Sequence, residues 1–406
     1  MSTASAANDA NVHDQLADLD ASRPEYATAF VNLLLDAASR IRASDVHLQP
    51  TASGLDVRWR LDGVLQPVGV FPRGEAADIV SRMKVLAELL TYRTDVPQEG
   101  RIRDRRGNVE IRVSTFPTLH GERAVVRLFA AQGEYLHLED LGLPEDISTR
   151  LGELLAETSG AIIITGPAGS GKTTTAYACL RELVRTSAGG KSIVSLEDPI
   201  ESAVDGVSQS RVNPNAGFDL AAGLRSLMRQ DPEAIMVGEI RDRATAEAAF
   251  QASLTGHLLL TTFHAGSAAG AISRLSDMGI EPYLLRSGIL GILSQRLVRR
   301  LCACRKPVPD EAAKLNLAAA HAWQSVGCGE CLDSGYRGRV VLAELLQASP
   351  SELGRAILSR SDAPQLEQLA IEAGMISIGQ RAKTAVEAGQ TSPSEVRRVL
   401  GFATRS

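Results

Sequence analysis

The spacing of apolar residues differs between the first third of the chain and the rest. In the first third, apolar side chains recur three and four positions apart over residues 30–41 and 79–90, the spacing of one helix face. Four other segments alternate apolar with polar residues, as half-buried strands do. Together these patterns predict a small α+β domain ending near Phe129. The alternating segments are 45–48, 55–61, 101–113 and 123–129, with turn signals at Asp62-Gly63, Gly107-Asn108 and His120-Gly121.

Short apolar runs replace this alternation in the central part of the chain. They occupy 161–165, 191–196, 234–239 and 255–264, and helical patterns separate them. Apolar runs alternating with helices are typical of the buried strands of a parallel sheet. The predicted fold class is therefore α/β, with the α+β domain placed before a parallel-sheet core.

Composition and pattern together divide the chain into six predicted parts. The first, residues 1–24, is rich in Ala, Ser, Asp and Asn, shows no apolar period, and predicts a disordered leader. The others are the α+β domain (25–130), a linker (131–150), the sheet core (151–300), a cysteine-containing insertion (301–340) and a helical region (341–406) without evident chemistry.

A glycine-rich loop follows the first apolar run and leads into a helical pattern. Residues 166–173 fit G-x-x-x-x-G-K-T, with strand before and helix after. The glycines allow backbone N–H groups to point at phosphate oxygens, and the helix N-terminus adds its positive dipole end. Lys172 is placed to reach the β- and γ-phosphates, and the Thr173 hydroxyl to bind magnesium. The predicted nucleoside-triphosphate site comprises Gly166, Pro167, Ala168, Gly169, Ser170, Gly171, Lys172, Thr173 and Thr174.

Glutamates stand at the ends of the second and third apolar runs, at the sheet edge where ligands bind. Glu197 opens the segment E-D-P-I-E, whose acids could hold magnesium or orient water; a solvated loop is the alternative. Glu239 follows Gly238, where ordinary P-loop enzymes place an aspartate. Glu239 is therefore predicted to act on the metal through water, or on the attacking water itself.

Two histidines, His257 and His264, belong to the fourth apolar run. On an uninterrupted strand their spacing would place them on opposite faces. Either they flank the strand at its two ends, or one is a core histidine. The flanking arrangement favours a γ-phosphate role for both.

Arginine is dense on the last strands of the α+β domain, at Arg101, Arg103, Arg112, Arg123 and Arg127. A solvated strand face is the usual explanation of alternating arginines.

Four of the five cysteines form two pairs. Cys328 and Cys331 have the C-x-x-C spacing of structural zinc sites, whereas Cys302 and Cys304 form a tighter C-x-C chelate. The pairs predict a four-thiolate zinc site. The fifth, Cys179, lies in an apolar helical pattern and is predicted to pack in the core.

Length and charge narrow the class of protein. With 406 residues the chain has room for two or three domains, and its net charge of −5 argues against a dedicated nucleic-acid binder. No apolar run approaches the roughly 20 residues of a membrane span, and no signal-peptide pattern opens the chain. A cytoplasmic location is predicted, where cysteines are thiols or metal ligands.

Taken in order, these motifs resemble the type II secretion and type IV pilus assembly ATPases over nearly all of residues 30–400. Residues 43–47 and 57–63 look like that family's PAS-like N-terminal module. Residues 197–201 resemble its Asp box, residues 228–242 its Walker B signature, and residues 255–264 its His box.

The resemblance implies a RecA-like P-loop ATPase core that uses ATP and Mg²⁺, with Zn²⁺ at the cysteines. It implies a homo-hexamer on the cytoplasmic face of the inner membrane, attached peripherally through a platform or docking protein and without direct nucleic-acid binding. Hydrolysis would drive domain motion that powers pseudopilus or pilus assembly, or type II secretion. In such a ring the arginine-bearing domain faces the ATP of a neighbour. Arg127 is the first candidate for the arginine that acts on this ATP.

Two departures from the family's pattern and two rival functions accompany this expectation. The leader is too short to form the additional docking domain of long members, and C-x-C replaces the usual first C-x-x-C. Cysteines at all four places nevertheless indicate the assembly and secretion branch. A DNA-translocating or competence-type motor should carry a basic pore-facing loop, and no such cluster is evident. A non-hydrolysing scaffold should lack Lys172 or Glu239, and both are present.

Overall fold

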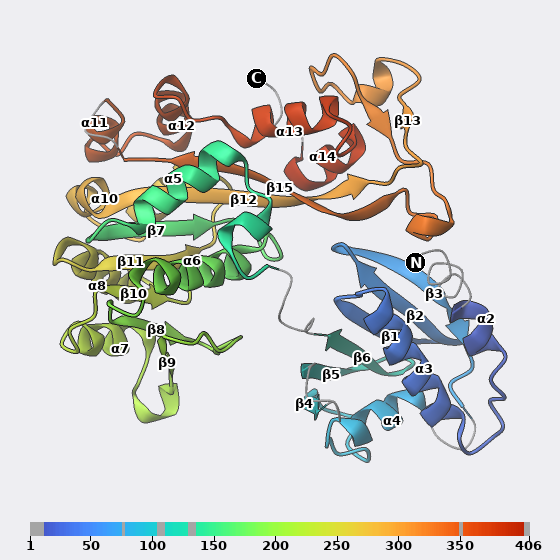
Figure 1. Ribbon diagram of the computed structural model, residues 1–406. Helices are drawn as coiled ribbons and strands as arrows, with labels where there is room; N and C mark the ends of the chain where they lie inside the picture. The colour runs from blue at the N-terminus through green and yellow to red at the C-terminus, as the bar shows by residue number, and fades with distance from the viewer. Residues whose placement is uncertain (1–11, 75–77, 104–109, 129–134, 349–351, 402–406) are drawn as a thin grey trace. The chain divides into compact units, whose positions relative to one another are not determined.

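The computed structural model describes residues 12–74, 78–103, 110–128, 135–348 and 352–401, which form two compact units (Figure 1). The first unit contains the N-terminal part of the chain together with two later segments, Cys302–Arg305 and Ser325–Gly338. The second unit contains the remainder. The fold is therefore mixed α/β, and the cysteine-bearing segments group with the N-terminal unit.

The first unit is a six-stranded sheet in the order β3-β2-β1-β6-β5-β4. Each pair of neighbouring strands in this order is antiparallel. One apolar core joins the sheet to helices α3 and α4. Asp62 and Gly63 both have positive φ (47° and 84°), as a two-residue hairpin turn requires, so that predicted turn is confirmed. The elements are α2 (Val12–Ala17), α3 (Tyr26–Arg40), β1 (Asp45–Thr51), β2 (Gly54–Leu61), β3 (Val64–Phe71), α4 (Ile79–Leu86), β4 (Gln98–Arg103), β5 (Glu110–Thr118) and β6 (Gly121–Leu128).

The segment that precedes α3 is partly helical. The leader prediction is wrong from Val12 onward, because α2 buries Val12 and Leu16 in the core and His13 bonds the Val68 carbonyl at 2.9 Å. One helical turn with two apolar residues is too short to produce a visible period. The turn predicted at Gly107-Asn108 lies outside the described residues.

The second unit is built on a seven-stranded sheet in the order β15-β12-β7-β11-β10-β8-β9. The pairs from β12 through β9 are parallel, as predicted. Alternate residues of β7 enter two different cores: Ala161 and Ile163 join one, Ile162 and Ile164 the other, so helices cover both faces of the sheet (Figure 1). The elements are α5 (Glu145–Leu155), β7 (Gly160–Thr165), α6 (Lys172–Ser187), β8 (Ile193–Glu197), β9 (Ser208–Arg211), α7 (Leu220–Leu227), β10 (Ala234–Val237), α8 (Arg243–Leu254), β11 (Leu258–Phe263), α9 (Ala268–Asp277), α10 (Pro282–Gly288), β12 (Ile289–Leu301) and β15 (Tyr336–Leu346).

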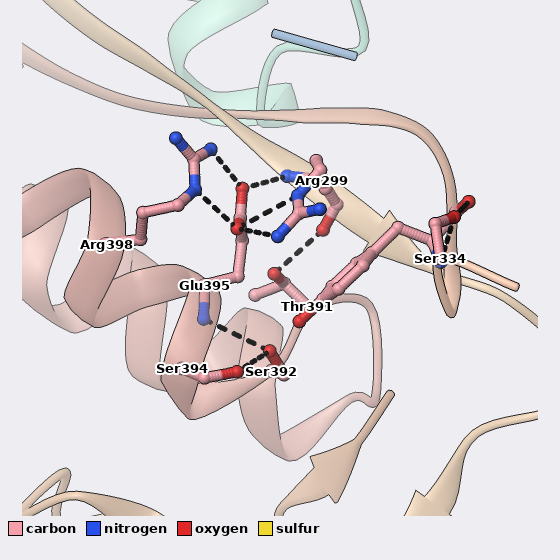
Figure 2. A network of polar contacts seen from close by, with 8 residues as sticks. Arg299, Ser334, Thr391, Ser392, Ser394, Glu395 and Arg398 are labelled. Carbon is pink, nitrogen blue, oxygen red and sulfur yellow. Dashed lines mark hydrogen bonds and ion pairs between the residues drawn. The ribbon is translucent and has the colours of Figure 1, made fainter. Parts of the chain in front are cut away.

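A short hairpin and a helical tail complete this unit. An ion network ties the last helix to β12: Glu395 accepts hydrogen bonds from Arg299 and Arg398, and Thr391 donates to the Arg299 carbonyl at 2.8 Å (Figure 2). Among the described residues no helix has both the length and the apolar character needed to cross a membrane. The remaining elements are β13 (Lys306–Pro307), β14 (Trp323–Gln324), α11 (Glu352–Leu358), α12 (Ala363–Glu372), α13 (Ile378–Glu387) and α14 (Pro393–Leu400).

Candidate nucleotide site at the carboxyl edge of the parallel sheet

The glycine-rich loop connects β7 to α6, which begins at Lys172. Gly166, Gly169 and Gly171 have φ of 152°, 74° and 89°, a region that residues with a Cβ rarely adopt. At Gly166 a Cβ would also lie 2.6 Å from the Gln295 carbonyl oxygen. The predicted strand–loop–helix order is confirmed, and the loop backbone requires its glycines.

Lys172 lies under the loop with its ammonium directed at loop carbonyls. Its Nζ donates to the carbonyls of Gly166 (2.9 Å) and Pro167 (3.1 Å) and lies 3.4 Å from Nδ1 of His264. Burial lowers the pKa of Lys172, and the nearby Glu239 carboxylate partly offsets this. The lysine is therefore held at the loop in contact with the end of a neighbouring strand.

Glu239 and His264 meet at the same edge of the sheet. Glu239 lies two residues beyond β10 and His264 one residue beyond β11, and these strands are paired in parallel. The His264 Nε2 lies 2.6 Å from Oε1 of Glu239, while Arg241 Nε donates to Oε2 at 2.5 Å. A continuous polar chain thus runs from Lys172 through His264 to Glu239 at the carboxyl edge of the sheet.

Glu197, the last residue of β8, is buried, and side chains around it use both carboxylate oxygens. Oε2 accepts from the Tyr177 hydroxyl, and Oε1 accepts from Ser195 (2.5 Å) and Gln209 (3.1 Å). Burial, and then the hydrogen bond to Glu197, raise the pKa of Tyr177 and keep it a donor. Tyr177 lies on the helix that begins with Lys172, so it links that helix to the acidic segment. Sequence reasoning missed this residue because an isolated tyrosine in a helix carries no motif.

His257 requires a correction. It precedes β11, so the strand separates it from His264 by roughly 20 Å, at about 3.3 Å per residue. Its Nδ1 lies 3.1 Å from the Ala252 carbonyl and 3.2 Å from the Thr255 hydroxyl, at the amino end of the sheet. The two histidines do flank the strand, but only His264 reaches the loop in this chain.

The arginines of the first unit form a cross-strand row. In the sheet register Arg101 pairs with Arg112, Arg112 with Arg127, Arg127 with Asp45, and Asp45 with Arg60. Directly opposed residues share a face of the sheet, so one carboxylate stands in line with four arginines. Arg127 is 63% exposed and pairs with Asp45 at 3.0 Å.

Arg123 lies four residues before Arg127, on the same face of β6. Its guanidinium lies 3.2 Å from Nδ1 of His47. Burial, followed by the charges of Arg60 and Arg123, lowers the pKa of His47, which favours the neutral ring as an acceptor for this arginine. This face of the sheet is therefore basic, and Asp45 and His47 hold two of its arginine side chains in place.

The four predicted zinc ligands come together in the first unit. Their sulfur atoms all lie within 4.8 Å of one another, with Cys302–Cys328, Cys328–Cys331 and Cys304–Cys331 separations of 3.8, 3.7 and 4.0 Å. A tetrahedron with Zn–S bonds of about 2.3 Å has edges of about 3.8 Å, so this sulfur arrangement fits zinc. The backbone N–H of Gly335 lies 3.2 Å from the Cys331 sulfur and can donate to it. The shortened C-x-C pair therefore reaches the site.

The sequence of the chain matches a known protein family. The sequence model of "Type II/IV secretion system protein" matches residues 21–398. The chain is 42% identical over 378 residues to the type II secretion system ATPase E of Vibrio cholerae, covering 91% of this chain and 74% of that protein. It is 38% identical over 381 residues to the type IV pilus assembly ATPase PilB of Thermus thermophilus, covering 91% and 42%.

A solved structure agrees on the fold. The ATPase DotB of Legionella pneumophila superposes with a TM-score of 0.66 at 23% identity, covering 91% of this chain and 94% of that one. The chain belongs to the type II/IV secretion system protein family and is a secretion or pilus motor ATPase.

Proposed function

We propose that the protein is a Mg²⁺-dependent ATPase whose hydrolysis powers pseudopilus or pilus assembly, or type II secretion, from the cytoplasmic face of the inner membrane. The observation that supports it best is the contact of Glu239 and Lys172 with His264 at the loop. In the proposed RecA-like core, these groups surround the γ-phosphate end of a nucleotide whose other phosphates rest on the loop.

Each residue of this site has a distinct task in the proposal. The loop N–H groups and Lys172 bind the phosphates, and Glu239 takes the proton of the attacking water while His264 holds its carboxylate. The Thr173 hydroxyl, at the start of α6, and the Glu239 carboxylate are oxygen donors of the kind magnesium prefers, and Glu239 would act through water. Magnesium would neutralise the charge on the phosphate oxygens. Glu197, which Tyr177 and Gln209 hold by hydrogen bonds, would position the acidic segment 197–201 for its role in holding magnesium or orienting water.

Glu239→Gln tests the assignment, because it removes the base and keeps the size of the side chain. We expect kcat to fall by roughly 10² to 10⁴-fold while ATP affinity changes by less than about threefold. Glu247→Gln, in the exposed Arg243–Glu247 pair of α8, is the matched control and should keep its activity. If ATP affinity fell in step with kcat, Glu239 would be a binding or folding residue.

We also propose that Cys302, Cys304, Cys328 and Cys331 bind one zinc ion as thiolates. When bound, zinc would cross-link the two chain segments that carry these residues. Elemental analysis of the purified protein should give about one zinc per chain, and serine substitution of Cys328 should abolish it. Metal-free protein in which all four thiols react freely in the folded state would exclude the site.

The basic row supports a third proposal, that an arginine of the first unit completes the site of a neighbouring subunit in a homo-hexamer. A face with four arginines to one carboxylate in line suits an anion, and an arginine at the γ-phosphate contributes roughly 10³ to 10⁵ in rate. Arg127 is the first candidate because it is exposed and lies in the middle of the row. Hydrolysis would then depend on subunit contact.

Mixing two inactive variants tests this arrangement. Arg127→Ala and Lys172→Ala should each be inactive, and mixed rings should recover part of the activity because some interfaces contain both intact residues. Arg58→Ala, in an exposed pair with Asp56 in the same sheet, is the control and should remain active alone. Mixed rings that assemble and stay inactive would refute action across the interface.

Attachment to the membrane is proposed to be peripheral, through an inner-membrane platform or docking protein of the machine. The protein that co-purifies with the intact chain from membranes would identify this partner. A DNA-translocating motor and a non-hydrolysing scaffold remain the alternatives that the Glu239→Gln measurement and a DNA-stimulation assay would distinguish.

A further inference from the structure

Gln295, in β12, forms hydrogen bonds with both the glycine-rich loop and helix α6, which follows the loop. Its side chain is buried, with the residue 1% exposed. Nε2 donates to the carbonyl of Ser170 at 2.7 Å, and Oε1 accepts from the Thr175 hydroxyl at 3.0 Å. Because a carbonyl can only accept, the nitrogen end of the amide must face Ser170. The orientation of the amide is therefore fixed by its partners.

The bond to Ser170 determines where the next N–H points. The Ser170 carbonyl and the Gly171 N–H belong to one planar trans peptide, so they point in opposite directions. With the carbonyl held toward Gln295, the Gly171 N–H is directed away from Gln295, to the side of the loop where phosphates are proposed to bind. Rotation of this peptide would present an oxygen to the phosphates in place of a donor.

The peptide needs such a restraint because Gly171 follows it. Gly171 has φ of 89° and carries no Cβ, so both orientations of the preceding peptide are sterically accessible to it. A Cβ at Gly171 would lie 3.0 Å from Nε2 of Gln295, which shows how closely the amide packs against the loop. The loop's own sequence thus permits rotation, and the contact that opposes it comes from another strand.

The backbone of Gln295 is itself anchored. Arg296 donates to the Gln295 carbonyl at 2.9 Å and also bonds the Gly266 carbonyl. The adjacent residue, Ser294, pairs in register with Thr165 at the end of β7. The amide is therefore presented from a part of β12 that is paired with the end of the strand that precedes the loop.

We infer that Gln295 is a positioning residue for nucleotide binding, which sets the Ser170–Gly171 peptide so that its N–H binds phosphate. The inference rests on the nucleotide role proposed for the loop. Gln295 lies outside the predicted loop and acidic motifs. Since this N–H would bind phosphate before and during the reaction, the effect falls on nucleotide affinity more than on the chemical step.

Gln295→Met tests the inference, because it keeps the length of the side chain and removes both hydrogen bonds. We expect KM for ATP and Kd for ADP to rise by roughly 10- to 100-fold, and kcat at saturating ATP to stay within about threefold. Thr175→Val removes only the bond to Oε1 and leaves the Ser170 contact, so its effect on affinity should be several times smaller. If Gln295→Met does not fold, Gln295→Asn, which withdraws the donor by one methylene, replaces it.

Two reference variants separate the possible failures. Gln98→Met makes the same chemical change in the first unit, where Gln98 also bonds backbone groups, and should leave KM unchanged. Lys172→Ala should abolish ATP binding; if it does not, the nucleotide role proposed for the loop fails. If Lys172→Ala abolishes binding while Gln295→Met leaves KM unchanged or lowers only kcat, the positioning role of Gln295 alone is refuted.

Discussion

The buried carboxylate of Glu395 gives the sharpest stability prediction. In the native state the side chain is fully buried between Arg299 and Arg398 (Figure 2), whose guanidinium groups lie 2.5 to 3.0 Å from its oxygens. The Arg299 backbone N–H also donates to it at 3.0 Å. Burial alone would raise the pKa of Glu395, but the bonds from Arg398 and Arg299 outweigh it and lower the pKa to about 2.

The lowered pKa of Glu395 corresponds to a contribution to the free energy of unfolding. With an ordinary pKa of 4.5 and a folded pKa of about 2, the charged form of Glu395 stabilises the fold by about 3 kcal/mol at neutral pH, at 1.36 kcal/mol per pH unit. Arg398 is 43% exposed, so solvent screens part of its interaction, and we expect about 2 to 3 kcal/mol. Because the folded pKa is depressed, this stabilisation is complete above about pH 4.5 and is lost as the pH falls toward 2.

Glu395→Gln removes the charge while conserving size, and leaves two guanidinium groups facing a neutral amide. Hydrogen exchange of the 391–401 segment in the intact protein measures the opening free energy of α14. We expect it to fall by about 2 to 3 kcal/mol near pH 7, and the difference from wild type to shrink to about half near pH 3. Glu352→Gln, in the exposed Glu352–Arg355 pair of α11, is the control and should change local stability by less than about 0.5 kcal/mol.

Two results would contradict the reasoning. A change below about 1 kcal/mol at neutral pH would mean that desolvation of the ions cancels their attraction. A difference that stays constant down to pH 3 would mean that Glu395 contributes through packing and not through its charge.

Three further predictions concern the two units separately. Lys84→Met should destabilise the first unit by about 3 to 5 kcal/mol in urea unfolding, because it leaves the buried Glu122 carboxylate without the ammonium that lies 2.8 Å away. The double variant Lys84→Met with Glu122→Leu should recover most of the lost stability. Tyr177→Phe should lower kcat by roughly tenfold with little change in KM, because it removes the donor to Oε2 of Glu197 without touching the loop. Unchanged turnover would exclude the link between Tyr177 and hydrolysis. Gly171→Ala should raise Kd for ADP at least about tenfold, because φ of 89° is strained for alanine and the added Cβ would contact Gln295. Calorimetric titration measures this Kd, and an unchanged value would contradict the prediction.

The elements with strong sequence periodicity were predictable, and so was much of the candidate site. The loop from Gly166 to Thr173 is a local motif, and the ends of parallel strands meet at one edge, so Glu239 and His264 could be placed near it from the sequence. The spacing of His257 and His264 could not show that His257 lies at the opposite end of β11 from the loop, because the sequence does not fix where the strand begins and ends. Tyr177 and Gln295 act through contacts 20 and 125 residues apart in the chain, and such contacts leave no local pattern.

The first unit shows a second limit of sequence reasoning. Two apolar residues in α2 carry no period, although burial of Val12 and Leu16 orders the segment. For the cysteines, spacing alone could not show whether C-x-C reaches a common site with C-x-x-C. The four sulfur atoms come from two segments, Cys302–Arg305 and Ser325–Gly338, and a contact between segments this far apart in the chain leaves no local pattern.

The interleaving of the two units has a consequence for how this protein can be cut or recombined. The chain passes between the units at 132/133, 301/302, 305/306, 324/325 and 338/339. A protease that cleaves between Gln132 and Gly133 would therefore produce two fragments that both contribute to the first unit. The C-terminal fragment still supplies Gly338, whose N–H donates to Asp62 of the N-terminal fragment at 2.7 Å. The nicked protein should stay associated under native conditions. A gene fusion that exchanged only residues 1–132 for those of a relative would likewise leave Cys302–Arg305 and Ser325–Gly338 packed against a foreign surface.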